Sequence, residues 1–300
     1  MKKRTAFISV LISMVPLVNP LVIKSSIFLS TSGVLISTAR KVNAESGDIY
    51  FERGIEKARS GDYENAVSNF TKVIEIEPNN SDAYFQRGWN KNKLKEHNEA
   101  ILDYRKAIEI NPNHENAYYN LGWTKYVLKD HYGAISDLNK VIKINPKSVR
   151  AYQGRGLNKQ EIRDHVGAIS DFIKVIDFDP NYIEAYVSRG WNKSALEDHY
   201  GAISDYNKAI KLDKENETAY YYRGWNKLKI SDYKGAIADY TKVLEFNPKD
   251  MGALTNRGNS KYELGDKKGA CEDYKKSISY GDKASEKWLK TKDATWCRDM

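Results

Sequence analysis

Residues 115–148 read ENAYYNLGWTKYVLKDHYGAISDLNKVIKINPKS. Small and apolar residues recur at a spacing of three or four in both halves, which predicts two amphipathic helices over roughly 115–129 and 132–144. Asp130 lies between them, where its carboxylate can accept a hydrogen bond from the first turn of the second helix. Pro146 ends that helix, because proline disfavours helical geometry in the residue before it. The stretch is therefore predicted to be a helical hairpin.

This hairpin pattern recurs seven times with a period of 34 residues and no insertion, over 47–80, 81–114, 115–148, 149–182, 183–216, 217–250 and 251–284. We number the positions of each repeat from 1 to 34. Position 8 is always glycine and position 20 is always alanine: Gly54, Gly88, Gly122, Gly156, Gly190, Gly224, Gly258 and Ala66, Ala100, Ala134, Ala168, Ala202, Ala236, Ala270. Position 32 is proline in five repeats: Pro78, Pro112, Pro146, Pro180, Pro248. Such a period predicts stacked repeat units.

The period, the small residues at positions 8 and 20, the aromatic residue at position 24 and the proline at position 32 resemble the tetratricopeptide repeat (TPR) family. The resemblance spans 47–284. It implies an all-α, right-handed solenoid in which the first helix of each repeat (helix A) lines the concave face and the second (helix B) the convex face. Lysine at position 11, where the family often has tyrosine, is a departure. Each repeat is expected to bury its apolar face only against its neighbours.

Residues 1–44 form a candidate leader, with a basic start and an apolar run over 8–23. The sequence Val42-Asn43-Ala44 has the small-residue form that signal peptidase recognises. We therefore expect export, to the periplasm or beyond, with cleavage near Ala44. A retained membrane anchor is the alternative, in which case the leader alone would contact the membrane. Pro16 and Pro20 interrupt the apolar run and therefore disfavour the membrane anchor.

Charge argues against nucleic acid as a partner. Six of the 48 Lys and Arg residues lie in 1–44 and none of the 40 Asp and Glu residues does, so the remainder carries a net charge of only about +2. Binding to phosphate backbones needs a basic face, not a basic leader. No phosphate-binding glycine loop, nucleophile motif or zinc-ligand spacing occurs, so neither enzymatic activity nor a cofactor is expected.

The C-terminal segment, 283–300, is predicted to begin with a helix that caps the last repeat. Ala284, Trp288 and Leu289 would form its apolar side. In an oxidising compartment, Cys271 and Cys297 are expected to pair and hold this cap in place. A buried thiol and a separate thiol in the tail remain the alternative.

Two recurring polar patterns have structural interpretations. Histidine occupies position 17 in four repeats: His97, His131, His165, His199. Packed helices lie about 8–10 Å apart, too far for one zinc ion, so these rings are expected to pack over the turn between helices A and B. Arg and Lys at positions 7 and 11 face Asp at position 23, as in Arg87, Lys91 and Asp103, which predicts an interhelical ion pair.

Aromatic residues give the strongest functional signal. The resemblance implies that positions 2, 5, 9, 12 and 13 face the concave groove, where charges of both signs are balanced. The candidate binding residues are Phe85, Trp89, Tyr119, Trp123, Tyr126, Trp191, Tyr221, Trp225 and Tyr262. Tyr and Trp are favoured at binding hot spots, although the tryptophans could instead pack between neighbouring A helices. Polar residues in repeat four, including Gln153 and Gln160, interrupt the aromatic series.

These observations predict an exported, non-enzymatic scaffold that binds a protein or peptide segment along an aromatic groove. The alternative is binding of a glycan or cell-envelope polysaccharide by the same rings, because aromatic faces also stack on sugars.

Overall fold

The computed structural model describes residues 46–299. The predicted leader and its cleavage point lie outside these residues. Regular secondary structure in the described part is helical throughout. The A helices are α1 (Gly47–Arg59), α3 (Ser81–Lys93), α5 (Glu115–Val127), α7 (Val149–Glu161), α9 (Ile183–Ala195), α11 (Glu217–Lys229) and α13 (Met251–Glu263). The B helices are α2 (Tyr63–Ile76), α4 (His97–Ile110), α6 (His131–Ile144), α8 (His165–Phe178), α10 (His199–Leu212), α12 (Tyr233–Phe246) and α14 (Lys267–Ser279).

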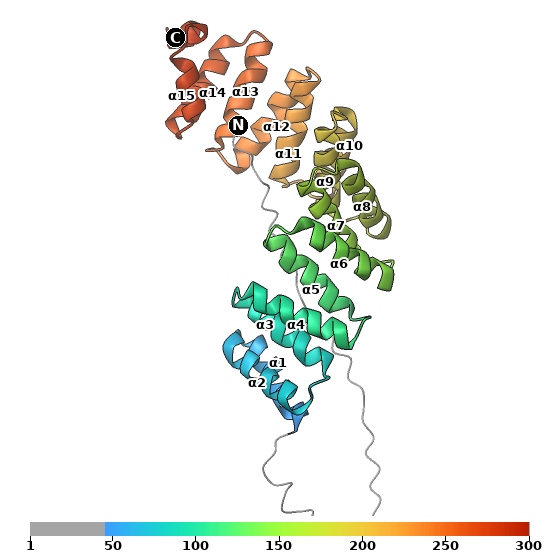
Figure 1. The fold of residues 1–300 in the computed structure, drawn as a ribbon. Helices are drawn as coiled ribbons and strands as arrows, with labels where there is room; N and C mark the ends of the chain where they lie inside the picture. Colours follow the sequence, from blue (N-terminus) through green and yellow to red (C-terminus); the bar gives the residue numbers. More distant parts are fainter. Residues whose placement is uncertain (1–45, 300) are drawn as a thin grey trace, which may run out of the picture. The chain divides into compact units, whose positions relative to one another are not determined.

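The helices belong to two compact units. The first ends at Ile110 and contains α1–α4, and the second begins at Asn111 and contains α5 and all later helices. Within each unit, helices A and B of a repeat pack together, and each B helix packs against the A helix of the next repeat (Figure 1). The predicted all-α class and stacked helical hairpins are thus confirmed. The regular period gave no indication of a division after Ile110.

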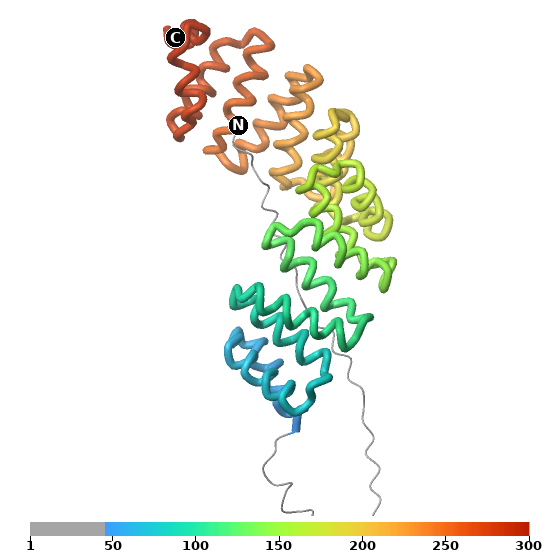
Figure 2. The backbone as a smooth tube through the Cα atoms, viewed as in Figure 1, coloured from blue at the N-terminus to red at the C-terminus, as the bar shows by residue number. Residues whose placement is uncertain are grey.

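In the second unit the A helices form one continuous row. Contacts join α5 to α7, α7 to α9, α9 to α11, and α11 to α13, whereas successive B helices make no contacts of comparable extent. Figure 2 shows these hairpins following one another along the chain. The A helices are therefore the more closely spaced row of this superhelical array. We call their outward surface in the second unit the A-helix face.

Local sequence sets where each hairpin turns. In repeat three, the turn ends with Asp130, whose side chain accepts a hydrogen bond from the backbone N–H of Gly133 at 2.9 Å. The same cap recurs at the aspartates of repeats four to seven. Immediately before it, position 15 adopts a left-handed conformation even where it is not glycine, as at Lys129 and Glu197, both with φ of 64°. The predicted N-cap at Asp130 is confirmed.

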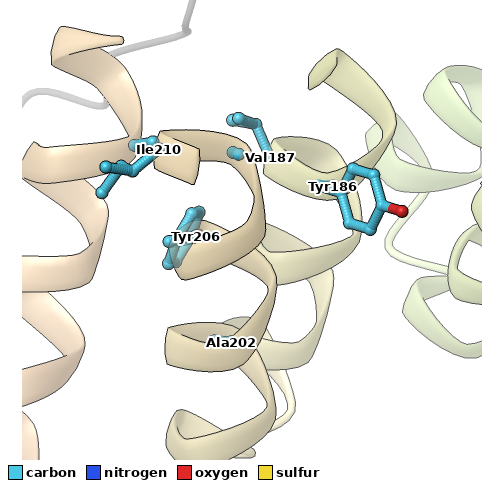
Figure 3. Packing of buried hydrophobic residues seen from close by; sticks show 7 residues of the cluster. Tyr186, Val187, Ala202, Tyr206 and Ile210 are labelled. Carbon is cyan, nitrogen blue, oxygen red and sulfur yellow. The ribbon is translucent and has the colours of Figure 1, made fainter. Parts of the chain in front are cut away.

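Glycine at position 8 permits the close crossing of helices A and B. A Cβ atom at Gly190 would lie 3.0 Å from the ring of Tyr206 and 3.3 Å from the carbonyl oxygen of Ala202. Both partners are completely buried. Figure 3 shows Tyr206 and Ala202 on α10, with Tyr186 and Val187 of α9 nearby. A larger residue at position 8 would therefore have to displace a ring in the core.

The predicted interhelical ion pairs are present in five repeats. In repeat five, Asp205 accepts hydrogen bonds from Arg189 at 2.6 and 3.0 Å and pairs with Lys193 at 2.9 Å. Repeat three differs, because Leu121 replaces the arginine and Asp137 pairs with Lys125 at 2.6 Å. The carboxylates are nearly buried, so the flanking cations neutralise charge that would otherwise be costly inside the fold.

None of the helices between residues 46 and 299 is long and apolar enough to cross a bilayer.

Candidate functional site

Two tryptophans on the A-helix face are held along one edge by the preceding repeat. The ring centroid of Trp191 on α9 lies 5.6 Å from that of His165, and Trp225 on α11 lies 5.9 Å from His199. Both tryptophans are half-buried. Each ring therefore packs between repeats and still presents part of its surface.

Each of these histidines is fixed by a buried asparagine from the next repeat. The Nδ1 atoms of His165 and His199 lie 2.9 Å from the Oδ1 atoms of Asn192 and Asn226. Both asparagines are fully buried, and each donates its Nδ2 to a backbone carbonyl four residues earlier. The asparagine Oδ1 is thus left to accept, and the histidine Nδ1 donates. These inter-repeat pairs were not foreseen, although both residue types recur visibly at positions 17 and 10.

Position 17 has a packing role in these repeats, as predicted, but its ring contacts the A helix of the next repeat and was expected at the turn of its own repeat. His131 follows the same pattern, with its Nδ1 3.1 Å from the Oδ1 of Asn158. Between residues 46 and 299, no group of three His, Cys, Asp or Glu side chains could hold a metal ion. The rings of His131, His165 and His199 instead link two repeats, whereas His97 bonds to Asn92 of its own repeat.

Repeat three contributes Trp123 and Tyr126, whose centroids are 5.3 Å apart. Tyr126 also lies 5.7 Å from His131 and is half-buried. Burial, with a smaller contribution from Glu161, raises the pKa of the Tyr126 hydroxyl above its ordinary value. The hydroxyl is therefore neutral at physiological pH and can serve as a hydrogen-bond donor beside the indole.

Tyr119 was predicted to face the groove, but the structure buries it. Only 4% of its surface is exposed, and the guanidinium of Arg150 lies 4.5 Å above its ring. Arg150 is held there by Glu115 at 2.8 Å and Asn116 at 2.6 Å. Tyr119 thus supports the arginine, and the surface at this point is Arg150. Neighbouring A helices pack so closely here that the side chain faces the next repeat.

Tyr221 on α11 lies among other aromatic residues. Its centroid is 5.6 Å from Tyr222 and 5.7 Å from Tyr240, and its hydroxyl accepts a hydrogen bond from the side-chain amide of Asn256 at 3.3 Å. The residue is half-buried. It therefore joins α11 to α13 and offers a fixed aromatic surface.

The polar interruption in repeat four is satisfied internally. The hydroxyl of Tyr182 donates to Gln153 at 2.7 Å, and Asn192 donates to Gln160 at 2.9 Å. Burial, followed by the nearby Glu184, raises the pKa of Tyr182 to about 12. Gln160 thus connects repeats four and five, whereas Gln153 is satisfied within repeat four, and repeat four separates the aromatic residues of repeat three from those of repeats five and six.

Phe85 and Trp89 belong to the first unit and are described there alone. Phe85 lies 6.1 Å from Tyr104, and Trp89 lies 6.0 Å from Tyr63. The ammonium of Lys93 is 4.9 Å from the Trp89 ring. Both aromatic residues of α3 are half-buried, which leaves part of each ring accessible.

Tyr262 is 41% exposed, and it meets the protein's own C-terminal segment. Its ring centroid lies 5.2 Å from that of Trp296. Trp296 belongs to α16 (Thr295–Arg298), which follows α15 (Lys283–Leu289) and the short 3-10 helix η2 (Lys292–Ala294). The residues after the capping helix show no helical pattern in the sequence, because a four-residue helix is too short to leave one.

The structure pairs Cys271 of α14 with Cys297 of α16 in a disulfide, which is the pairing that the sequence favoured. The predicted capping helix is also present as α15. Its apolar side differs from the prediction, because Ala284 is exposed and Ser285 is buried. The cause is Asp282, which caps α15 and accepts hydrogen bonds from both the backbone and the hydroxyl of Ser285.

Comparisons with known proteins agree with this architecture. A family model described as "Tetratricopeptide repeat" matches residues 47–80, 115–148 and 183–216, and one described as "TPR repeat" matches 92–129. A solved structure of MamA protein is 27% identical, covers 56% of this chain and 92% of its own, and has a TM-score of 0.54.

Two further structures show the fold alone. A tetratricopeptide repeat protein from Parabacteroides merdae is 20% identical, with 85% of this chain and all of its own covered and a TM-score of 0.61. YrrB, described as "a TPR protein with an unusual peptide-binding site", is 20% identical, with 62% and 95% covered and a TM-score of 0.56. No curated protein matches the sequence.

Proposed function

Because this chain is a tetratricopeptide-repeat protein with seven helix pairs in its described part, we propose that it is a non-enzymatic scaffold that binds a protein or peptide segment. The binding surface is the A-helix face of the second unit. Its central contacts are Trp123, Tyr126, Trp191, Tyr221 and Trp225. The peptide-binding site in the description of YrrB supports the same class of ligand.

The observation that carries this proposal is the partial anchoring of Trp191 and Trp225. Their inner edges pack on His165 and His199, each of which is itself hydrogen-bonded to a buried asparagine. A ring that is already fixed loses little conformational freedom when a ligand covers it, so more of the contact energy contributes to affinity. Large rigid aromatic surfaces are also the commonest hot spots of protein interfaces.

Charges on the same helices are of both signs. Lys229 lies 5.0 Å from the ring of Trp225, and Arg150 covers Tyr119, while Glu161 and Glu184 are exposed on α7 and α9. Neither sign dominates, so a segment of mixed or low charge fits better than a polyanion or a strongly basic peptide.

We also propose that the protein is exported and works outside the cytoplasm. The leader in residues 1–44 motivates this, and the disulfide between Cys271 and Cys297 supports it, because such bonds persist in oxidising compartments. Fractionation of cells followed by mass spectrometry of the protein's N-terminus tests it. Recovery of an intact N-terminus in the cytoplasm would contradict export.

The binding surface can be tested with a peptide selected on the purified protein from a random library and followed by fluorescence anisotropy. Trp191→Ala and Trp225→Ala are each expected to weaken binding at least tenfold, while Trp191→Phe retains most of it. Loss of one hot-spot aromatic residue usually costs about 2 kcal/mol or more. The far-ultraviolet circular dichroism of each variant shows whether the helices persist.

Tyr200→Ala is the matched control, because Tyr200 is an aromatic residue that is 74% exposed on the B helix α10. Its removal should leave peptide affinity unchanged. If it weakens binding as much as Trp191→Ala does, the A-helix face is not the site. Titration of tryptophan fluorescence with soluble oligosaccharides tests the glycan alternative, and saturation by a sugar but by no peptide would favour it.

A further inference from the structure

A pocket lies at the C-terminal end of the second unit, apart from the aromatic residues of α9 and α11. Its volume is about 430 Å³, within the range of small-molecule sites. Residues from α13, α14, α15 and the final segment line it, and α15 packs against α14 at this end of the chain (Figure 1). The pocket exists only because the C-terminal segment folds back over the last repeat.

Four aromatic side chains form a connected wall of this pocket. Tyr262 lies 5.2 Å from Trp296, Trp296 lies 6.0 Å from Trp288, and Trp288 lies 4.8 Å from Tyr274. The angles between successive ring planes are 31°, 63° and 60°. With these angles between them, the ring faces surround the pocket and do not lie in one plane. A flat platform for a sugar ring would need rings that are nearly coplanar.

The charged residues that line the pocket are both acidic. Asp282 and Asp293 contribute to the wall, and no Lys, Arg or His does. Asp282 is already engaged, because its side chain accepts hydrogen bonds from Thr255 at 2.9 Å, Ser277 at 3.1 Å and Ser285 at 2.6 Å. Burial opposes its ionisation, but these hydrogen bonds outweigh that effect and hold the pKa of Asp282 below its ordinary value.

Asp293 differs from Asp282 because it is exposed and, among residues 46–299, makes no side-chain hydrogen bond or ion pair. Its carboxylate is therefore available to a ligand. Asp282 adds a fixed negative charge behind Asp293 and does not need to contact the ligand directly. Together with the ring faces, which are themselves electronegative, the two aspartates give the pocket a uniformly negative lining.

We propose that this pocket binds an organic cation, in the form of an alkylated ammonium group enclosed by Tyr262, Trp288 and Trp296 and paired with Asp293. Aromatic faces attract such cations, and the attraction strengthens when the cation is desolvated. Methyl groups around the nitrogen suit aromatic walls better than a hydrated ammonium does. A metal ion does not fit, because the described residues offer no group of three acidic, His or Cys ligands.

The disulfide connects this site to the redox state of its surroundings. Cys297 follows Trp296 directly, and its bond to Cys271 fixes α16 against α14. Trp296 is the ring that joins Tyr262 to Trp288. The complete aromatic wall therefore requires the oxidised protein, so the pocket is expected to bind its cation only where the disulfide is formed.

Calorimetry with choline on the full chain tests the proposal, with the neutral alcohol 3,3-dimethylbutan-1-ol as its uncharged counterpart. Choline is expected to bind at least fivefold more tightly than the alcohol. Asp293→Asn should weaken choline binding about fivefold and leave the weak binding of the alcohol unchanged. Asp299→Asn is the control, because Asp299 is exposed and lies outside the pocket, and it should have no effect.

Tyr262→Phe should retain choline binding and Tyr262→Leu should reduce it about fivefold, because only the former keeps the ring face. Tyr262 is exposed enough for both variants to fold. Equal affinity for choline and the alcohol, no choline binding at millimolar concentrations, or full affinity in Asp293→Asn would each overturn the proposal. None of these results would affect peptide binding at Trp191 and Trp225, so the two proposals can fail separately.

Discussion

The interior repeats and the C-terminal end of the second unit are held together by different means. In repeats four and five, a histidine at the start of helix B bonds to a buried asparagine of the following repeat and packs on its tryptophan, as His165 does with Asn192 and Trp191. Repeat seven has no following repeat. There, a disulfide and a connected set of aromatic rings, including Tyr262 and Trp296, join the last hairpin to the C-terminal segment.

The difference shows how the role of a repeat position changes when no following repeat packs against it. Position 32 is proline in five repeats, where it ends helix B, but in repeat seven it is Asp282. Asp282 starts the capping helix and binds three hydroxyl groups. Position 12 likewise supplies Tyr126 to the A-helix face in repeat three and Tyr262 to a closed-over pocket in repeat seven. What a side chain at a given repeat position contacts therefore depends on which segment packs over it.

The largest expected effect concerns the buried carboxylates of the interior. Asp205→Ala removes the partner of two cations, Arg189 and Lys193, and should lower the free energy of unfolding by about 3–5 kcal/mol, because both charges lose their compensation. Urea denaturation followed by circular dichroism measures the loss.

Repeat three supplies the control for this variant. Asp137→Ala removes the partner of Lys125, and Leu121 stands where the arginine would be. Its loss of stability should be clearly smaller than that of Asp205→Ala. Equal losses in the two variants would show that the arginine adds nothing to the interior ion pairs.

A smaller effect is expected at the C-terminal end. Cys297→Ser opens a loop that spans 26 residues and should cost about 3 kcal/mol by loop-closure entropy. In a repeat protein such a loss stays near its origin. Hydrogen exchange should therefore become faster in α14–α16 and remain unchanged in α9 and α10. Uniformly faster exchange would mean that the cap and the interior unfold as one cooperative unit.

The smallest expected effect is a gain in stability. Position 15 adopts positive φ throughout, but it is glycine only in the terminal repeats, as Gly61 and Gly265, and another residue in the interior. Glu197→Gly should stabilise the protein by about 0.5–1 kcal/mol, because a left-handed conformation costs a residue with a side chain more than it costs glycine.

Gly265→Ala should destabilise the protein by a similar amount. Thermal melts of the two variants measure both shifts. A loss of stability in Glu197→Gly together with a gain in Gly265→Ala would mean that the greater freedom of glycine in the unfolded chain outweighs the turn geometry.

Much of the fold could be read directly from the sequence, because a 34-residue period repeats the same local instructions. Asp130 as a helix cap and Asp205 between two cations were each expected from their repeat positions. Most of the predicted aromatic residues are half-buried on the A helices. Tyr119 is not, because its exposure depends on where Arg150 of the next repeat lies.

The sequence by itself determined the hairpins, their order and the residues that recur in them, because these follow from helix periodicity, capping and steric size within a few turns of chain. Only the tertiary structure decided which rings are covered, that His165 meets Asn192 across a repeat boundary, and that Trp296 returns to Tyr262. Those contacts join residues 27 and 34 positions apart, and their geometry depends on how neighbouring hairpins pack. The pocket lined by Asp293 was likewise decided only by the tertiary structure, because it is formed by a segment that has no repeat pattern of its own.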